Sequence, residues 1–158
     1  MKKRTKKILI ISLIALLGIV FIFSKATRIS PIALGIHNET YTPIFSDEAI
    51  KGYDPITYLT EQKAVAGDKT YSYEWNNANW SFSSEENKNL FIAHPEKYAP
   101  QYGGYCALAV SRGITAFISP ESFEIVDDKL YLFADDAAHK KWKIDQVENL
   151  KKSDANWK

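Results

Sequence analysis

The chain has 158 residues, with 20 Lys and Arg, 19 Asp and Glu, and a single cysteine, and its formal net charge is +1. Six of the bases and none of the acids lie in the first 26 residues, which leaves residues 27–158 with 14 bases against 19 acids, a net charge of −5. Such an acidic region argues against nucleic acid as a partner and against electrostatic binding to anionic lipid. One cysteine rules out an intrachain disulfide.

The first 26 residues have the pattern of a targeting or anchoring segment. Five basic residues precede an apolar run from Ile8 to Phe23. This run is longer than the apolar part of a typical cleaved signal peptide, about 7–15 residues, and slightly shorter than a typical membrane span, about 17–25 residues. We expect an uncleaved single-pass anchor in the cell membrane, with the N-terminus in the cytoplasm and everything after Lys25 outside it. Cleavage at Ser24-Lys25-Ala26, which would give a secreted or periplasmic protein, is the alternative.

Residues 27–45 have no periodic pattern and are interrupted by Pro31, Gly35 and Asn38, which indicates a juxtamembrane connector. The remaining residues, 46–158, are numerous enough for one compact domain with one core. No internal repeat is evident in them. The sequence thus predicts a signal anchor at 1–26, a connector at 27–45 and an extracytoplasmic domain at 46–158.

The first part of this domain predicts a short helix, a hairpin and a longer helix. Asp54-Pro55 is typical of an N-cap followed by proline at the first helical position. Aromatic and polar residues alternate over 71–75, which predicts a half-buried strand. Asn76-Asn77 then turns the chain into a returning strand at 80–82. Ser83-Ser84-Glu85-Glu86 fits a capping box that begins the next helix.

The second part predicts a similar mixture of short elements. Gly103-Gly104 is expected to begin a helix that ends at Gly113. Residues 123–133 predict a second hairpin, turning at 127–129. Asp135-Asp136 is expected to cap one last helix, which runs through Trp142 and Leu150. The predicted fold is a small α+β domain with two antiparallel β-hairpins and several short helices, preceded by an N-terminal hydrophobic helix.

Several motifs occur together in an order that is found in a known family. They are Gly52-Tyr53-Asp54-Pro55, Trp80-Ser81-Phe82, Tyr98-Ala99-Pro100-Gln101, Tyr102-Gly103-Gly104-Tyr105-Cys106, Leu130-Tyr131-Leu132 and Asp154-Ala155-Asn156-Trp157. This series resembles the exported YHS-domain proteins of bacteria over nearly all of residues 46–158. Related YHS and TRASH-like domains are thought to bind metal through cysteines near Asp54-Pro55 and Trp80-Ser81-Phe82, where this chain has none. In some exported members selenocysteine is thought to occupy the position of Cys106, which implies a chemical role for its thiol.

Cys106 is the candidate catalytic residue. A thiol that follows two glycines at a helix start can be stabilised as a thiolate by the helix N-terminal amides. The alternative is a small buried residue with no chemistry. The candidate binding residues around the thiol are Asp54, as a carboxylate partner or merely a helix cap, and Tyr53, Tyr102, Gly103, Gly104 and Tyr105. A tyrosine at 102 or 105 is expected to donate a hydrogen bond to the sulfur.

Two functions remain open, and the sequence does not settle whether the protein is an enzyme. The first is a membrane-anchored extracytoplasmic YHS-like domain whose thiol serves redox chemistry or binds a soft metal such as copper. One sulfur cannot complete a copper site, so other ligands would be required. The three histidines, His37, His94 and His139, have no metal-binding spacing. The second function is a non-catalytic module that holds a small ligand or an envelope protein, with Cys106 structural.

Overall fold

The computed structural model describes residues 37–157, so the predicted anchor at 1–26 and the connector up to residue 36 lie outside the described residues. Within the described part, no helix combines the length and apolarity that are needed to cross a membrane. The elements in chain order are η1 (Ala49–Gly52), α2 (Pro55–Thr60), β1 (Asp68–Trp75), β2 (Ala78–Phe82), α3 (Glu85–Ala93), α4 (Pro95–Tyr98), η2 (Gln101–Gly104), α5 (Ala107–Ser111), β3 (Ser119–Val126), β4 (Lys129–Phe133), α6 (Asp136–Ile144) and α7 (Gln146–Asn156).

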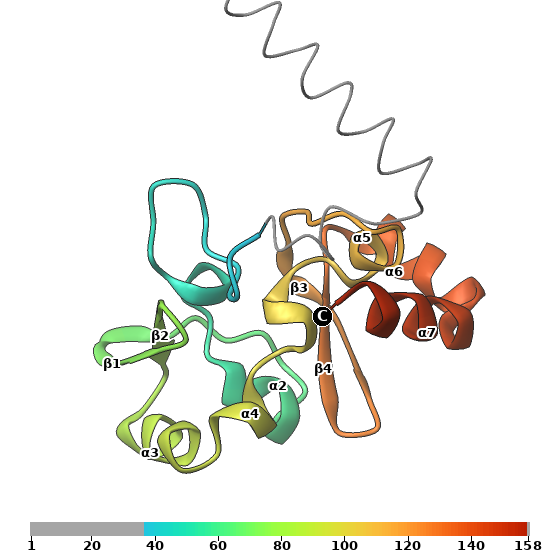
Figure 1. Ribbon diagram of the computed structural model, residues 1–158. Helices are drawn as coiled ribbons and strands as arrows, with labels where there is room; N and C mark the ends of the chain where they lie inside the picture. Colours follow the sequence, from blue (N-terminus) through green and yellow to red (C-terminus); the bar gives the residue numbers. More distant parts are fainter. Residues whose placement is uncertain (1–36, 158) are drawn as a thin grey trace, which may run out of the picture.

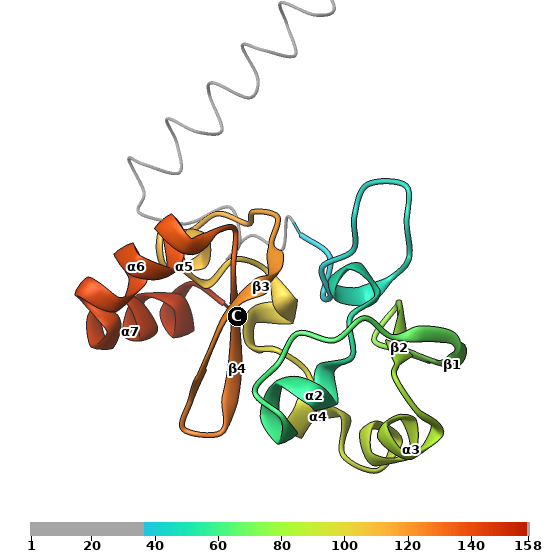
Figure 2. The same ribbon diagram turned by 180° about the vertical axis from the view of Figure 1, so that it is seen from behind.

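The described chain is a mixed α+β structure, as the sequence predicts. Strands β1 and β2 form one antiparallel two-stranded sheet, and β3 and β4 form another. Helix α3 lies beside the first hairpin, whereas α5, α6 and α7 gather beside the second (Figure 1). The same division is visible from behind (Figure 2). Each hairpin is therefore covered by helices that are close to it in the sequence.

The order of elements repeats once along the chain, although no repeat is evident in the sequence. A 3-10 helix, a short α-helix, a hairpin and two further helices occupy residues 49–98, and the same series occupies residues 101–156. A β-bulge interrupts the ladder of both hairpins at the same place, between the pairs Asp68–Phe82 and Ser72–Ser81 in the first and Ser119–Phe133 and Phe123–Leu132 in the second. Equivalent positions in the two hairpins are thus 51 apart, from Asp68 to Ser119 and from Phe82 to Phe133.

The two hairpin turns use the same backbone conformation with different residues. Asn76 and Asn77 have φ of 53° and 59°, and Asp127 and Asp128 have φ of 50° and 58°. Two successive left-handed residues match the right-handed twist of a tight hairpin, and Asn and Asp tolerate this conformation better than most residues. The predicted hairpins are therefore confirmed.

The helix that follows each hairpin is capped in the same way. The Ser84 hydroxyl accepts a hydrogen bond from the Asn87 N–H at 3.1 Å, and the Asp135 carboxylate accepts one from the Ala138 N–H at 2.7 Å. The sequence placed the capping box one residue earlier, at Ser83. The hydroxyl of Ser83 instead donates to a buried carboxylate, so the next serine takes the cap.

The last helix predicted from the sequence is two helices in the structure. Asp145, with φ −142° and ψ 53°, separates α6 from α7, just as His94, with φ −144° and ψ 60°, separates α3 from α4. Pro95 accounts for the first break, because proline disfavours helical backbone in the residue before it. No proline follows Asp145. There the Asn149 side chain donates to the Trp142 carbonyl at 3.0 Å, which satisfies an acceptor near the end of α6.

One aromatic residue from each of these helices fills the core of its half. Phe91 and Trp142, at equivalent positions, are fully buried. Their nearest ring centroids on the hairpins are those of Trp80 and Phe82, 5.0 and 5.2 Å from Phe91, and those of Tyr131 and Phe133, 6.0 and 5.7 Å from Trp142. The side chains differ, but the packing scheme is shared.

The end of the predicted connector is part of the folded domain. Thr40 and Tyr41 are buried. The Tyr41 N–H donates to the Gly103 carbonyl at 2.7 Å, and the Tyr41 carbonyl accepts from the Ile50 N–H at 3.2 Å. The Thr40 hydroxyl donates to the Asn76 carbonyl at 3.2 Å. The segment therefore joins elements of both halves.

The shared capping geometry predicts matched losses of stability. Ser84→Ala and Asp135→Ala each remove one capping oxygen, so each should lower the free energy of unfolding by about 1 kcal/mol. Urea unfolding of the full chain in detergent measures both. Ser84→Asp and Asp135→Ser retain a capping oxygen and are controls that should lie close to wild type. A loss at one cap only would contradict the equivalence of the two helix starts.

Candidate functional site

Cys106 is buried at the N-cap of α5, with 2% of its surface exposed. Its N–H donates to the Ala116 carbonyl at 3.3 Å, and its backbone forms a bridge with Leu132 of β4. Its side chain belongs to the apolar core of the domain. This is the placement of a packed core residue, whereas a reactive thiol needs access to its partner.

Asp54 is also buried and also precedes a short helix. One carboxylate oxygen accepts from the Ile56 N–H at 2.9 Å. The other accepts from the Ser83 N–H at 2.8 Å, the Ser83 hydroxyl at 2.7 Å and the Asn87 side-chain amide at 2.7 Å. Four donors satisfy this buried side chain and join α2 to α3. No hydrogen bond within residues 37–157 links Asp54 to Cys106, so the carboxylate acts as a cap and a tie between elements.

Cys106 and Asp54 are equivalent positions in the two halves. Each follows a Gly-Tyr pair that ends a 3-10 helix, and each is the N-cap of the next α-helix. The positions in the second half that correspond to Ser83 and Asn87 are Ala134 and Ala138, which pack against the core. A carboxylate with polar partners in one half is thus replaced by a thiol with alanines in the other. This replacement gives the cysteine a structural explanation.

The two glycines before Cys106 are required by the backbone. Gly103 and Gly104 have φ of +60° and +81°, in the left-handed region that glycine adopts without strain. A Cβ on Gly104 would lie 2.9 Å from Ile50 Cγ2, and a Cβ on Gly103 would clash with the Glu39 carbonyl. The glycines therefore allow a tight turn and close approach of two chain segments.

The residues around Cys106 do not fit a copper site. Within residues 37–157, no three His, Cys, Asp or Glu side chains gather as a metal site would need. His139, beside the acidic start of α6, has its Nε2 3.0 Å from a Glu124 oxygen and stacks on Phe133. A single buried thiol offers too few ligands for a soft metal.

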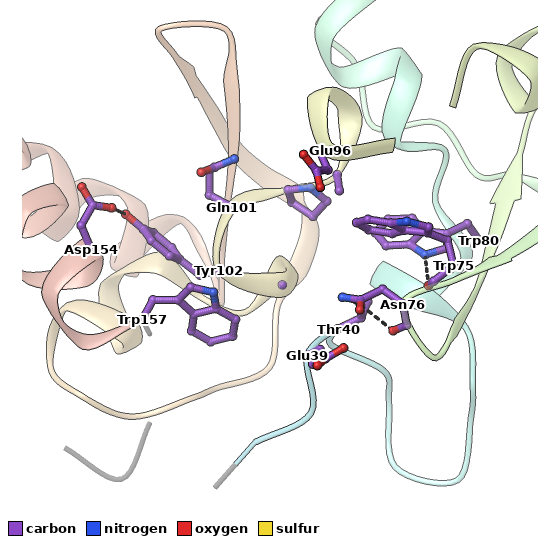
Figure 3. Close-up of a pocket in the computed structure, with 13 residues that line it drawn as sticks. Glu39, Thr40, Trp75, Asn76, Trp80, Glu96, Gln101, Tyr102, Asp154 and Trp157 are labelled. Atoms are coloured by element: carbon purple, nitrogen blue, oxygen red, sulfur yellow. Dashed lines mark hydrogen bonds between the residues drawn. The ribbon is translucent and has the colours of Figure 1, made fainter. Parts of the chain in front are cut away.

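A cavity lies elsewhere, between the two halves. It has a volume of about 510 Å³, which is in the usual range for small-molecule sites. Figure 3 shows Trp75 and Trp80 on one side and Tyr102 and Trp157 on the other. The thirteen lining residues are Glu39, Thr40, Trp75, Asn76, Trp80, Glu96, Ala99, Pro100, Gln101, Tyr102, Gly103, Asp154 and Trp157. Of the candidate catalytic and binding residues that the sequence analysis named around Cys106, only Tyr102 and Gly103 line this cavity.

Hydrogen bonds fix the walls of this cavity. The Trp80 indole donates to the Trp75 carbonyl at 3.0 Å. The Tyr102 hydroxyl donates to an Asp154 carboxylate oxygen at 2.9 Å rather than to the cysteine sulfur. Burial, and then this hydrogen bond to Asp154, raise the pKa of Tyr102 well above its usual range, so its phenol stays protonated. The two aromatic walls are therefore preformed.

The other predicted tyrosines lie outside the cavity lining. The Tyr53 hydroxyl donates to a Glu121 oxygen at 2.7 Å, which raises the pKa of Tyr53 and lowers that of Glu121. Tyr105 makes an edge contact with Tyr41 at 5.5 Å between ring centroids, and burial raises its pKa. Both side chains hold segments together.

Sequence reasoning did not identify the cavity as a site. Its walls come from the start of the folded chain, the first hairpin, α4, η2 and the end of α7. The signals in the sequence were the surplus of aromatic residues and the final Asp154-Ala155-Asn156-Trp157 motif. Neither shows that Trp75 and Trp157 face one cavity.

The burial of Cys106 predicts an unreactive thiol in the folded protein. At a pH near the ordinary thiol pKa of about 8.5, a disulfide reagent such as Ellman's reagent should label the folded full chain far more slowly than the chain unfolded in guanidinium chloride. The absorbance of the released thiolate measures both rates. Equal rates would show an accessible thiol and would restore the thiol hypothesis, in which Cys106 serves redox chemistry or binds a soft metal.

Comparison with protein-family models, with curated proteins and with solved structures gave no match to this chain.

Proposed function

We propose that the protein is a membrane-anchored, extracytoplasmic YHS-like domain that acts as a non-catalytic binding module for a small organic cation. The cavity between the halves carries the proposal, because it combines aromatic walls with carboxylates. The ligand would be a quaternary ammonium or amine group on a small body. The export of the domain and its YHS-like character rest on the sequence alone.

The aromatic walls favour a cation over a neutral polar ligand. Trp75, Trp80, Tyr102 and Trp157 line the cavity, and Trp80 also packs against Trp75 of the same hairpin, with 5.9 Å between their ring centroids. The electron-rich faces of Trp and Tyr attract cations, and several rings around one space form the aromatic cages that hold quaternary ammonium groups. The ring centroids of Tyr102 and Trp157 are 6.1 Å apart, so both belong to one wall.

The charges around the cavity favour the same ligand class. Three carboxylates line it, those of Glu39, Glu96 and Asp154, and no Lys or Arg is among its described lining residues. None of the three forms an ion pair with another residue of the range 37–157. The nearby Lys97 ammonium lies over the Tyr98 ring, 5.0 Å from its centroid. The negative potential at the cavity is thus available to a ligand.

The thiol hypothesis has less support from the structure. Cys106 is buried, is not part of the cavity lining, and has a structural explanation as the counterpart of Asp54. A binding role needs none of its chemistry.

Choline and its neutral isostere 3,3-dimethyl-1-butanol test the charge requirement directly. We expect choline to bind to the full chain in detergent, and the isostere, with the same shape but no charge, to bind at least about tenfold more weakly, because it lacks the attraction to rings and carboxylates. Isothermal titration calorimetry measures both. Equal affinities would contradict a cation site, and no binding of either would contradict the proposed function.

Substitutions in the cavity wall should weaken choline binding without unfolding the protein. Trp157→Ala removes one aromatic face and should weaken binding about tenfold, whereas Trp157→Phe should restore much of it. Glu96→Gln should weaken binding and reduce its dependence on salt. Glu61→Gln changes an exposed carboxylate that is outside the cavity and should leave binding unchanged. Thermal unfolding checks that each variant is folded, and identical affinities in all four would refute this site.

A further inference from the structure

Two loops on one end of the domain expose large apolar side chains. Ile44 and Phe45 are 85% and 104% exposed, and Ile114 and Phe117 are 47% and 65% exposed. The first pair lies in the loop between Tyr41 and η1, and the second in the loop between α5 and β3. Other exposed aliphatic residues, on α3 and near the junction of α6 and α7, are on helices instead.

The two loops form one surface. A hollow of about 520 Å³ lies between them and has no charged residue in its lining, which consists of Tyr41, Thr42, Pro43, Ile44, Tyr105, Thr115, Ala116 and Phe117. Both views show the loops at the same end of the molecule, opposite the turn that joins β3 to β4 (Figures 1 and 2). The two loops that carry the exposed apolar residues therefore lie at a common end of the domain.

A tight turn places Phe45 in the solvent. The Ser46 N–H donates to the Pro43 carbonyl at 3.0 Å, and Phe45 has φ of 66° in this turn. Its ring is fully exposed, next to the exposed Ile44. Neighbouring exposed apolar side chains are a mark of sites that interact with another protein or a membrane.

The chain itself brings this surface close to a membrane. The described chain begins at His37, whose ring stacks on Trp157 at 4.3 Å and is 6.2 Å from that of Tyr105, which lines the hollow. The apolar run that is expected to span the membrane ends at Phe23, and the 13 intervening residues let His37 lie at most roughly 50 Å from it when fully extended. The proposed anchor therefore joins the domain beside the Tyr105 wall of the hollow and keeps the apolar loops within reach of the bilayer.

We propose that Ile44, Phe45, Ile114 and Phe117 insert into the outer leaflet of the membrane, at the boundary between lipid headgroups and acyl chains, and hold the domain against the bilayer. This inference rests on the proposed membrane anchor but not on the cation site. Aromatic and aliphatic side chains on loops are suited to this boundary, where a few buried groups add binding energy in proportion to their apolar area. Because residues 27–158 carry a net charge of −5, docking depends on apolar insertion and the tether, not on attraction to anionic lipid.

A second copy of the chain is a weaker choice of occupant. A stable dimer usually buries about 1,200–2,000 Å² in total, whereas four side chains on two loop tips offer a small and uneven surface. Loop tips suit a deformable lipid surface better than a rigid protein face.

Spin labels on the full chain in phosphatidylcholine vesicles test the docking. A nitroxide on Ile44→Cys should be several-fold more accessible to oxygen, which dissolves in lipid, than to an aqueous nickel complex. A nitroxide on Asp128→Cys, in the exposed turn at the opposite end, should show the reverse and is the matched control. Both labels are placed in a Cys106→Ala background. Adding Phe45→Asp and Phe117→Asp, both at exposed positions, should make the label at position 44 aqueous without loss of folding.

Three results would overturn the proposal. An aqueous label at position 44 in otherwise unchanged protein would show that the loops do not dock. Spin–spin broadening that disappears on dilution with unlabelled protein would identify a second copy as the occupant. Failure of the chain to enter vesicles would remove the anchor on which docking rests. Choline titration of the same samples reports on the cation site separately, so failure of docking and failure of the binding function are distinguishable.

Discussion

A two-stranded hairpin cannot bury an apolar face by itself, and this constraint underlies the rest of the structure. Each hairpin is closed by one aromatic residue from the helix that follows it, Phe91 in the first half and Trp142 in the second. Each unit remains small, so the two halves must also pack on one another. The capping residues, bulges and left-handed turns recur because each half meets the same requirement.

Packing of two similar units explains where the cavity is and why the cysteine is elsewhere. The cavity lies at the junction, with Trp75 from the first half and Trp157 from the second. The positions of Asp54 and Cys106 are inside the halves, where each begins a short helix. One half has a carboxylate and polar groups there, and the other has a thiol and alanines. Cys106 therefore does not line the cavity on which the proposed binding function rests.

Local features of the fold could be predicted from the sequence because they depend on nearby residues. Asp54-Pro55 and Asn76-Asn77 determine a cap and a turn through their own side chains and backbone preferences. The break at Asp145 could not be predicted, because no proline marks it. The Asn149 amide that donates to the Trp142 carbonyl lies in a stretch whose sequence pattern is helical throughout. The repeat was hidden because equivalent core residues, such as Trp80 and Tyr131, share size and burial more than identity. The cavity depends on contacts between segments far apart in the chain, and the hydrophobic periodicity of the sequence does not reveal such contacts.

The buried segment at Thr40 and Tyr41 has a mechanical consequence. It is hydrogen-bonded to Gly103 of the second half and to Asn76 of the first, and Thr40, Asn76 and Gly103 all line the cavity. Under the proposed anchoring, a force that reaches the domain from its N-terminal side would load these hydrogen bonds before it reaches the two cores. A ligand that bridges the walls of the cavity would then resist the separation of the two halves under tension.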